Sequence, residues 1–286
     1  MSLVGQTPPP QDVWASLDQP ARNAAYDNNS AVQGVAAWAE RRNAASSTYR
    51  AAHSQHLDLR YARGVRAAFD LYPASDPAAP CLVFIHGGYW QRNSREVFAT
   101  YAEGLAEAGW SIAMPSHTLA PEASLASIVA EIGLALDWLA EHGPAHGVSG
   151  PVIVSGWSAG AHLAAMHLGH PSVAAGLAIS GVYDLAPIRD TNLNEALKLT
   201  DTEIVTLSPL QLPAVPKPLA IAYGTAELPA LVHDSRALHE RRAAAHAPGP
   251  LLPVADADHF SILDALREPN GQLIRAAQAL IAGLRS

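Results

Sequence analysis

From residue 81 onward the chain alternates short apolar stretches with amphipathic ones, and this alternation limits the folds that it can adopt. Apolar runs bounded by turn residues, such as CLVFIH at 81–86 and PVIVSG at 151–156, are typical of buried strands. Between them, residues 124–142 carry apolar side chains at helical spacing. Strands that alternate with helices form parallel sheets covered on both faces. We therefore expect an α/β fold with a mostly parallel central sheet of about eight strands.

The same patterns locate the other elements. Expected strands cover 57–62, 66–73, 81–86, 110–117, 151–156, 175–184, 218–225 and 251–258, and expected helices cover 31–42, 94–108, 124–142, 159–169, 229–245 and 271–284. Residues 1 to 20 are polar and proline-bearing, so we expect them to be irregular. The polar stretch 185–212 interrupts the alternation, which predicts a small cap-like excursion above the sheet.

The length of 286 residues suits a single large α/β domain. We expect residues 51–286 to form this catalytic domain, with the cap-like insertion at about 185–212. Residues 1–50 are expected to be an N-terminal extension, partly helical, that packs on or covers the catalytic domain.

The composition excludes several classes of protein. Hydrophobic residues make up 49 % of the chain and charged residues 15 %, so a large core is expected and disorder is not. A net charge of -8 argues against nucleic-acid and anionic-membrane partners. No run approaches the roughly 20 apolar residues that span a bilayer, and the first residues lack a secretory pattern, which favours a cytoplasmic protein. The one cysteine, Cys81, lies in an apolar run and is expected to be a core thiol.

The segment VSGWSAGAHLAA at 154–165 places Ser158 between Gly156 and Gly160. It ends an expected strand and begins an expected helix. A direct reversal from strand to helix strains its apical residue and needs small neighbours, which is the arrangement of a nucleophile elbow. Ser158 is therefore the candidate nucleophile.

A serine hydroxyl needs a base to accept its proton. His259 follows the last expected strand, in DADHFSIL. Twelve other histidines compete with it, and none of the following comes after that strand: His53, His56, His86, His162, His167 and His170. The histidine in turn needs a carboxylate. Glu227 lies three residues after Gly224 and is the favoured acid. Asp234, inside the following helix, is its rival, and Asp256 and Asp258 belong to the loop that already supplies the histidine.

The motif HGGYW at 86–90 follows the strand CLVFI, and its glycines allow a close backbone approach to a ligand. The amides of Gly88 and Tyr89, with that of Ala159, are the expected donors to an oxyanion. No zinc-type spacing and no phosphate-binding glycine motif occurs in the sequence, so neither a metal nor a cofactor is expected.

These motifs together resemble the kynurenine formamidases (arylformamidases) of the α/β-hydrolase fold. The resemblance covers about residues 57 to 268 and rests on HGGYWQ, SGWSAGAHLAA, SGVYDLAPI, TNLNEALKL and DHFSILDAL. It implies a triad of Ser158, Glu227 and His259, and an oxyanion loop at Gly87, Gly88 and Tyr89. The sequence departs from the family at Trp157, where histidine is commoner, and at Glu227, where many members carry aspartate.

The resemblance implies a serine hydrolase that cleaves an N-formyl or N-acyl aryl amine, with N-formyl-kynurenine as the favoured substrate. Trp90, Trp157 and Tyr183, besides Tyr89, are candidates for an aromatic wall around it. A carboxylesterase acting on small acyl or aryl esters is the alternative, because the same machinery cleaves both classes. A non-catalytic binding protein on a hydrolase scaffold is a third option. A small-molecule partner is expected, and a homodimer is compatible with the sequence.

Overall fold

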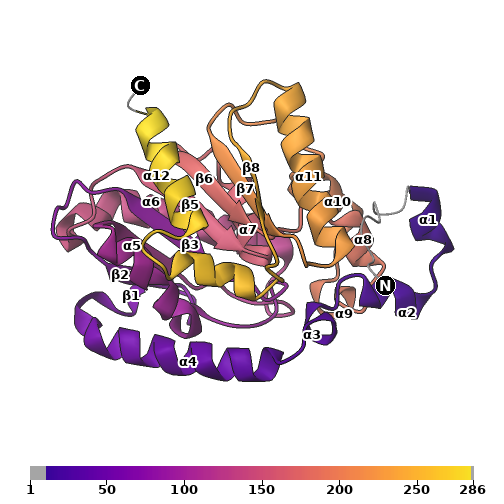
Figure 1. Cartoon of the computed structure of the whole chain (residues 1–286), viewed down its shortest axis with the longest axis horizontal. Helices are drawn as coiled ribbons and strands as arrows, with labels where there is room; N and C mark the ends of the chain where they lie inside the picture. The colour runs from indigo at the N-terminus through magenta and orange to yellow at the C-terminus, as the bar shows by residue number, and fades with distance from the viewer. Residues whose placement is uncertain (1–10, 285–286) are drawn as a thin grey trace.

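A computed structural model describes residues 11–284 and contains one eight-stranded sheet in the order β1-β2-β4-β3-β5-β6-β7-β8 (Figure 1). The strands are β1 Leu59–Arg60, β2 Ala68–Tyr72, β3 Cys81–Ile85, β4 Ser111–Pro115, β5 Val152–Trp157, β6 Val173–Ile179, β7 Leu219–Gly224 and β8 Leu251–Val254. The α-helices are α1 Gln11–Ser16, α2 Gln19–Ala24, α3 Asn28–Ala31, α4 Val35–Ala52, α5 Glu103–Glu107, α6 Leu125–His142, α7 Ala159–Met166, α8 Ala186–Arg189, α9 Asn194–Leu197, α10 Asp201–Leu207, α11 Pro229–Ala244 and α12 Gln272–Leu284. Four 3₁₀ segments complete them: η1 Ser54–His56, η2 Arg95–Ala102, η3 Gly143–His146 and η4 Ser261–Leu266.

The sheet is parallel from β4 to β8, whereas β2 runs antiparallel to both β1 and β4. The prediction of a mostly parallel sheet of about eight strands is therefore confirmed. Because β3, β5, β6, β7 and β8 point the same way, their carboxyl ends meet at one edge. This edge is where ligands bind in open α/β sheets.

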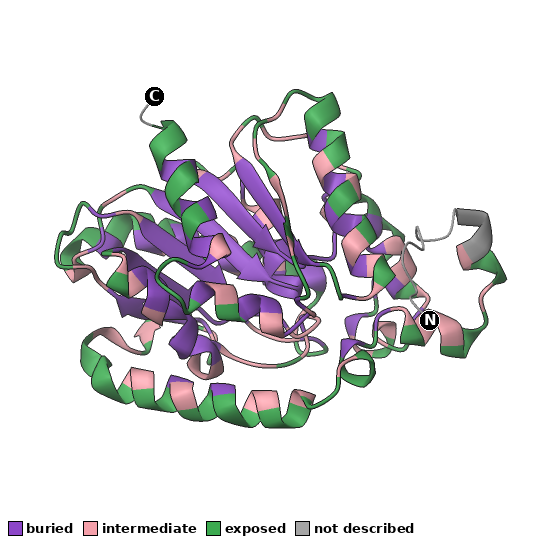
Figure 2. Ribbon diagram, in the orientation of Figure 1, coloured by how far each residue is buried: buried purple, intermediate pink, exposed green. Residues whose placement is uncertain are grey.

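Helices cover both faces of the sheet, and β2 to β7 are almost entirely buried, whereas the edge strands β1 and β8 are partly exposed (Figure 2). On one face, α6, α7 and α11 contribute apolar side chains such as Ile132, Leu163 and Leu238 to a core cluster. On the other face, η2, α5 and α12 contribute Phe98, Leu105 and Ile274. The near-continuous apolar strands predicted from the sequence follow from this burial on two sides.

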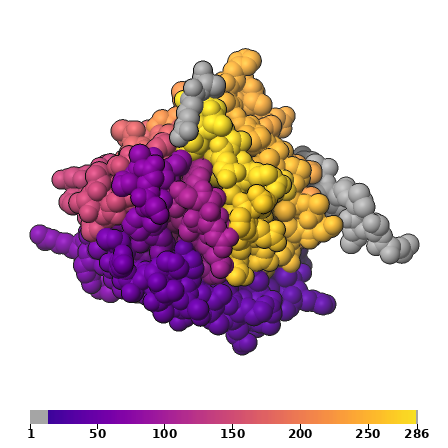
Figure 3. Space-filling view, turned by 60° about the vertical axis from the view of Figure 1, so that its left-hand side comes forward, coloured from indigo at the N-terminus to yellow at the C-terminus, as the bar shows by residue number. Residues whose placement is uncertain are grey.

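The long helix α4 lies across the molecule outside these two layers (Figures 1 and 3). Its Ser46 hydroxyl donates to Val97 O over 2.9 Å and accepts from the Thr100 N–H over 3.2 Å, which binds α4 to η2. One turn later Arg50 donates to Asp70 on β2 over 2.6 Å. Helix α4 is thus joined to η2 and to the sheet by polar contacts as well as by packing.

Asp70 is the buried carboxylate in these contacts, and two cations hold it. Arg95 donates to Asp70 Oδ1 over 2.9 Å, and the Asp58 N–H donates to the same oxygen over 3.1 Å. Burial opposes ionisation of this carboxylate, but the hydrogen bond from Arg50 and the charge of Arg95 outweigh it, so the pKa of Asp70 is lowered. The cluster therefore stabilises the fold only while Asp70 is ionised.

Three expectations about local structure need correction. The part of residues 1–20 that the structure describes is helical in α1 and α2 rather than irregular; residues 1–10 lie outside the described range. The helix expected at 31–42 begins at Val35, after Gly34 at φ 78°, and continues to Ala52. The strand expected at 175–184 ends at Ile179. Because many side chains of α4 are polar, the helical spacing of its apolar residues does not indicate where the helix ends.

No helix among residues 11–284 has both the length and the apolar composition to cross a membrane.

We predict that Asp70→Asn lowers the free energy of unfolding by about 3 kcal/mol, because it removes the buried carboxylate to which both Arg50 and Arg95 donate. Since the folded-state pKa of Asp70 is lowered, its contribution is fully present above the unfolded pKa of about 3.9 and is lost as the pH falls through the folded pKa. Urea unfolding at several pH values checks both statements: the difference between wild type and variant should shrink below about pH 4. The exposed Glu240→Gln in α11 is the control, and a difference that stays constant into strong acid would contradict the assignment.

Candidate functional site

Ser158 occupies the junction between β5 and α7 with φ 58° and ψ -121°. A side chain is strained at this positive φ, and close backbone packing holds it there. A Cβ at Gly156 would lie 2.2 Å from Gly160 O, and one at Gly160 would lie 2.0 Å from Ile85 O. The glycines on both sides of Ser158 are therefore required by contact, as an elbow of this kind demands.

Glu227 and His259 meet at the carboxyl edge of the sheet. The His259 Nδ1–H donates to Glu227 Oε2 over 3.0 Å, and both side chains are buried. The other carboxylate oxygen, Oε1, accepts from the Ser180 hydroxyl over 2.5 Å and from the Gly224 N–H over 2.6 Å. With its Nδ1 proton held by Glu227, the imidazole presents Nε2 as an acceptor.

Ser180 is a residue that the sequence reasoning missed. It follows β6 directly, at φ 53°, and therefore lies at the same edge as the ends of β5 and β7. Its hydroxyl satisfies a buried carboxylate oxygen that would otherwise lack a second donor. The signal available in the sequence was its position, directly after an apolar strand and before Gly181.

Asp234, the rival acid, does not contact His259. Its Oδ2 accepts from the Tyr183 N–H over 2.6 Å and from the Asp184 N–H over 3.2 Å. Burial raises the pKa of Asp234 to about 7. Asp234 therefore anchors the loop after β6. Asp258 is occupied locally as well, because its Oδ1 accepts from the Phe260 and Ser261 N–H groups.

The loop after β3 approaches the elbow closely. A Cβ at Gly87 would lie 2.6 Å from Trp157 O and 2.9 Å from Ser158 Cβ, while Gly88 has φ 122° and Tyr89 has φ 49°. The Gly88, Tyr89 and Ala159 N–H groups donate to no protein acceptor within residues 11–284. Three backbone donors thus stand without partners around the elbow, which is the composition of an oxyanion hole.

His86 begins this loop but is not placed as a base. It is buried and stacked on His117 with ring centroids 4.6 Å apart, and its Nδ1–H donates to Gly87 O over 3.0 Å. Burial and the neighbouring His117 hold the pKa of His86 well below its usual range. A neutral imidazole here supports the loop. No group of three or more histidine, cysteine or carboxylate side chains within 11–284 is arranged to hold a metal ion.

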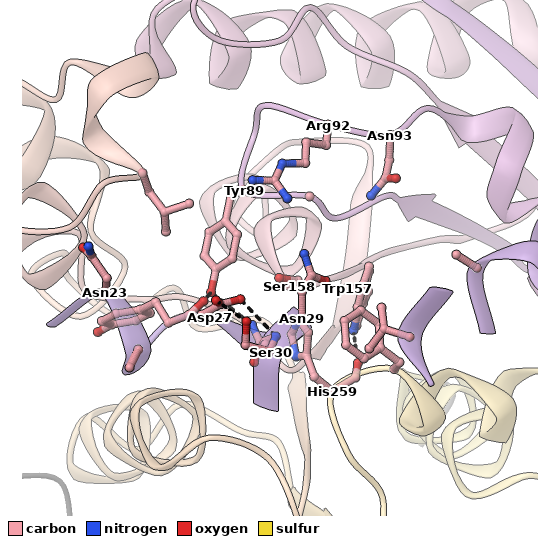
Figure 4. A pocket seen from close by; sticks show the side chains of 18 of the residues that line it. Asn23, Asp27, Asn29, Ser30, Tyr89, Arg92, Asn93, Trp157, Ser158 and His259 are labelled. Carbon is pink, nitrogen blue, oxygen red and sulfur yellow. Dashed lines mark hydrogen bonds between the residues drawn. The ribbon is translucent and has the colours of Figure 1, made fainter. Parts of the chain in front are cut away.

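A cavity of about 610 Å³ opens beside these residues (Figure 4). Ser158, His259, Gly88 and Tyr89 line it, and the serine hydroxyl forms no hydrogen bond to a protein group in the described part of the chain. Most of the remaining lining comes from the N-terminal segment: Pro20, Asn23, Ala24, Tyr26, Asp27, Asn28, Asn29, Ser30, Val35, Trp38, Ala39 and Arg42. Asn192 and Leu193, in the stretch 185–212, also contribute.

The Tyr89 side chain fastens the N-terminal segment to the oxyanion loop. Its hydroxyl donates to Tyr26 O over 2.7 Å and accepts from Asn28 Nδ2 over 3.0 Å. Burial raises the pKa of Tyr89 far above its usual range, so the phenol stays neutral. Tyr89 thus contributes its backbone N–H to the candidate oxyanion hole, while its side chain holds the N-terminal segment.

Of the three other expected aromatic contacts, only Trp157 lines the cavity. Its Nε1–H donates to His259 O over 2.7 Å, and its ring lies 4.8 Å from the imidazole, with Trp38 and Phe260 packed around the pair. Trp90 and Tyr183 are fully buried in the core instead, Trp90 with its ring against His162. Trp38 of α4, Tyr26 and Phe260 also line the cavity, and the sequence reasoning singled out none of them.

Known structures with this fold are esterases and related hydrolases. A protein from Silicibacter sp. TM1040, described as a candidate thioesterase, superposes with a TM-score of 0.78 at 27 % identity, over 90 % of this chain and 98 % of that one. Esterase B from Lactobacillus rhamnosis superposes with a TM-score of 0.70 at 16 % identity, over 94 % and 97 % of the two chains.

Sequence comparisons point to one group. The BD-FAE family model matches residues 69–176. A kynurenine formamidase from Danio rerio is 27 % identical over 241 residues, which are 79 % of this chain and 81 % of that protein. A kynurenine formamidase from Salmo salar is 31 % identical over 166 residues, 54 % of this chain and 55 % of that protein. The chain has the α/β-hydrolase fold and is similar in sequence to the kynurenine formamidases. Its resemblance to that group, first drawn from the motifs, is therefore confirmed, as is its fold.

We predict that Gly87→Ala lowers the free energy of unfolding by about 2 kcal/mol, because the added methyl group overlaps the Trp157 carbonyl. Urea unfolding measures the change. Gly169→Ala is the matched control, since its Cβ would meet only Val215 Cγ2 at 3.7 Å. Equal stability of the two variants would mean that the loop after β3 moves away from the elbow without cost.

Proposed function

We propose that this protein is a serine hydrolase that cleaves an N-formyl or N-acyl aryl amine through an acyl-enzyme, with N-formyl-kynurenine as the favoured substrate. The observation that carries the proposal is the buried hydrogen bond between His259 and Glu227 on the wall of the cavity that Ser158 also lines. The kynurenine formamidases to which the chain is similar give the substrate class.

In the first step Ser158 attacks the acyl carbon while His259 accepts the hydroxyl proton at Nε2. The hydrogen bond from Nδ1–H to Glu227 keeps Nε2 unprotonated beforehand and stabilises the imidazolium afterwards. Ser180 and Gly224 keep Glu227 in place, since both donate to its second oxygen. No hydrogen bond links the Ser158 hydroxyl to the His259 imidazole in this structure, and catalytic hydrogen bonds often tighten only when substrate binds.

The negative charge of the tetrahedral intermediate would lie against the N–H groups of Gly88, Tyr89 and Ala159. Each such donor is typically worth about 3 kcal/mol of the barrier. Because these amides have no protein acceptor to give up within the described residues, they stabilise the oxyanion without first breaking a bond.

His259 then donates its proton to the departing aniline nitrogen, and the acyl group stays on Ser158. A water molecule, deprotonated by the same imidazole, attacks the acyl-enzyme and releases formate or another small acid. An aryl amine is a better leaving group than an alkyl amine, so the three side chains suffice for the reaction.

A carboxylesterase is the second candidate, favoured by structural neighbours that are esterases. The nucleophile, base and oxyanion donors would be the same. The two candidates differ in the leaving group, which is an alcohol or phenol in place of an aniline.

We predict that a fluorophosphonate probe labels the wild-type protein and fails to label Ser158→Ala, because the probe needs the activated hydroxyl. Hydrolysis of N-formyl-kynurenine should fall by about 10³-fold or more in the same variant. Comparing kcat/KM for N-formyl-kynurenine and for p-nitrophenyl acetate separates the candidates. A formamide value several orders of magnitude below the ester value would reject the formamidase proposal, and labelling that survives in Ser158→Ala would reject the nucleophile.

We further predict that Trp157→Phe lowers kcat about tenfold with little change in KM, because it removes the Nε1–H donor that holds the His259 carbonyl. Trp110→Phe, a matched truncation of a buried indole that does not line the cavity, should leave kcat unchanged. Steady-state kinetics on one substrate gives both constants. If Trp157 acts mainly as a substrate contact, KM will rise instead of kcat falling.

A further inference from the structure

Arg42 of α4 is a buried cation on the wall of the catalytic cavity. It is only 8 % exposed, yet it is among the residues that line the cavity with Ser158 and His259. Arginine is rarely buried to this degree without a carboxylate partner. Its position therefore needs an explanation.

The protein supplies no anion to Arg42. Its Nε and Nη2 both donate to the neutral Asn43 Oδ1, over 3.1 and 2.9 Å, and within residues 11–284 it takes part in no ion pair and its Nη1 has no acceptor. Burial lowers the pKa of Arg42, although a guanidinium remains protonated. A donor edge with a full positive charge is thus left unsatisfied.

Aromatic rings hold the guanidinium in a fixed position. It lies 4.7 Å from the centroid of the Trp38 ring and 4.4 Å from that of Phe98. Stacking on two rings attracts the cation, but it leaves the N–H groups in the guanidinium plane free for an anion. The arrangement orients Arg42 without neutralising it.

A second cavity also borders Arg42, and two of its acidic residues, Glu103 and Asp264, face other cations. Glu107 and Glu268, which also line it, form no ion pair with Arg42 within residues 11–284. Glu103 pairs with Arg267 over 3.2 Å. Burial raises the pKa of Asp264, and the cations whose charges act on it are Arg267 and Arg41. These carboxylates therefore leave Arg42 without a partner.

We propose that Arg42 binds a carboxylate of the substrate, so that the cavity selects aryl acyl compounds that carry a negative charge on the aryl side. Trp38 and Trp157, whose ring centroids are 6.2 Å apart, lie between Arg42 and His259. An aryl group along Trp38 would place its acyl bond toward Ser158 and its charged substituent toward Arg42. The planar guanidinium of an arginine can donate two parallel hydrogen bonds to one carboxylate.

The inference rests on the proposed function for the acyl chemistry, but the carboxylate preference applies equally to an amide or an ester. Arg92, which also lines the cavity, is the rival cation. It is exposed at the rim, and a charge there is screened by water. The buried position of Arg42 predicts that it makes the stronger contact.

The test uses two pairs of substrates that differ only in charge: N-formyl-kynurenine with its α-carboxamide, and 4-acetoxyphenylacetate with 4-acetoxyphenylacetamide. We expect Arg42→Met to lower kcat/KM for the charged member of each pair by about 30-fold or more, as for loss of a buried charge partner. The neutral members should change by less than about twofold. Arg42→Lys keeps the positive charge but loses the two-pronged guanidinium geometry. Its kcat/KM for the charged substrates should therefore lie between that of the wild type and that of Arg42→Met.

Arg41→Met, on the same helix but outside the catalytic cavity, is the matched control, and Arg92→Met tests the rival. Binding is measured without catalysis as well: phenylacetate should raise the Tm of the wild type and not that of Arg42→Met, whereas phenylacetamide should raise neither. Equal loss for charged and neutral substrates in Arg42→Met, a selective loss in Arg92→Met instead, or no phenylacetate shift in the wild type would overturn the proposal. A protein that hydrolyses only the ester pair, with the expected dependence on Arg42, would reject the formamidase proposal and leave this one standing.

Discussion

The close approach of backbone segments around Ser158 is the constraint on which the rest of the site depends. Gly156, Gly160 and Gly87 each leave room that a methyl group would fill, and together they bring β3, β5 and α7 to within contact of one another. The strain at Ser158 is tolerated because these contacts are made by a buried parallel sheet. The proposed nucleophile and the proposed oxyanion donors are therefore positioned by the same three glycines.

Different contacts position His259 beside this elbow. Glu227 follows β7 and His259 follows β8, so their hydrogen bond joins two neighbouring strand ends. Trp157, the last residue of β5, then binds the His259 carbonyl through its indole N–H. The residue that departs from the family pattern thus connects the elbow to the histidine loop. In this chain an indole at that position supports the imidazole from its backbone side.

The sequence predicted the sheet, the helices that cover its two faces and the residues that meet at its edge, because apolar periodicity and strand–helix alternation are local patterns. Glu227 was preferred to Asp234 as the candidate acid because it lies closer in sequence to the end of the strand. In the structure Glu227 accepts a hydrogen bond from His259, and Asp234 accepts one from the Tyr183 N–H. What the sequence did not predict depends on contacts between distant segments. The position of Ser180 after an apolar strand places it at the edge of the sheet, but nothing local marks it as the donor to Glu227. Nothing local marks Trp38 and Arg42 as lining residues either. Trp90 was misassigned because composition alone does not distinguish a core ring from a ligand contact.

Catalytic groups and cavity walls come from different parts of the chain. The proposed catalytic side chains lie at strand ends, whereas residues 20–42 enclose the space in front of them. Hydrogen bonds from Tyr89 to Tyr26 and from the Asn192 N–H to Asn23 hold this segment in place. Just before it, Trp14 and Gln19 both donate to Asp190. Substitutions in that one short peripheral segment would reshape the enclosure without disturbing the hydrogen bonds that drive bond cleavage. With such a layout, related proteins can differ in the substrates they bind while they keep the same catalytic side chains.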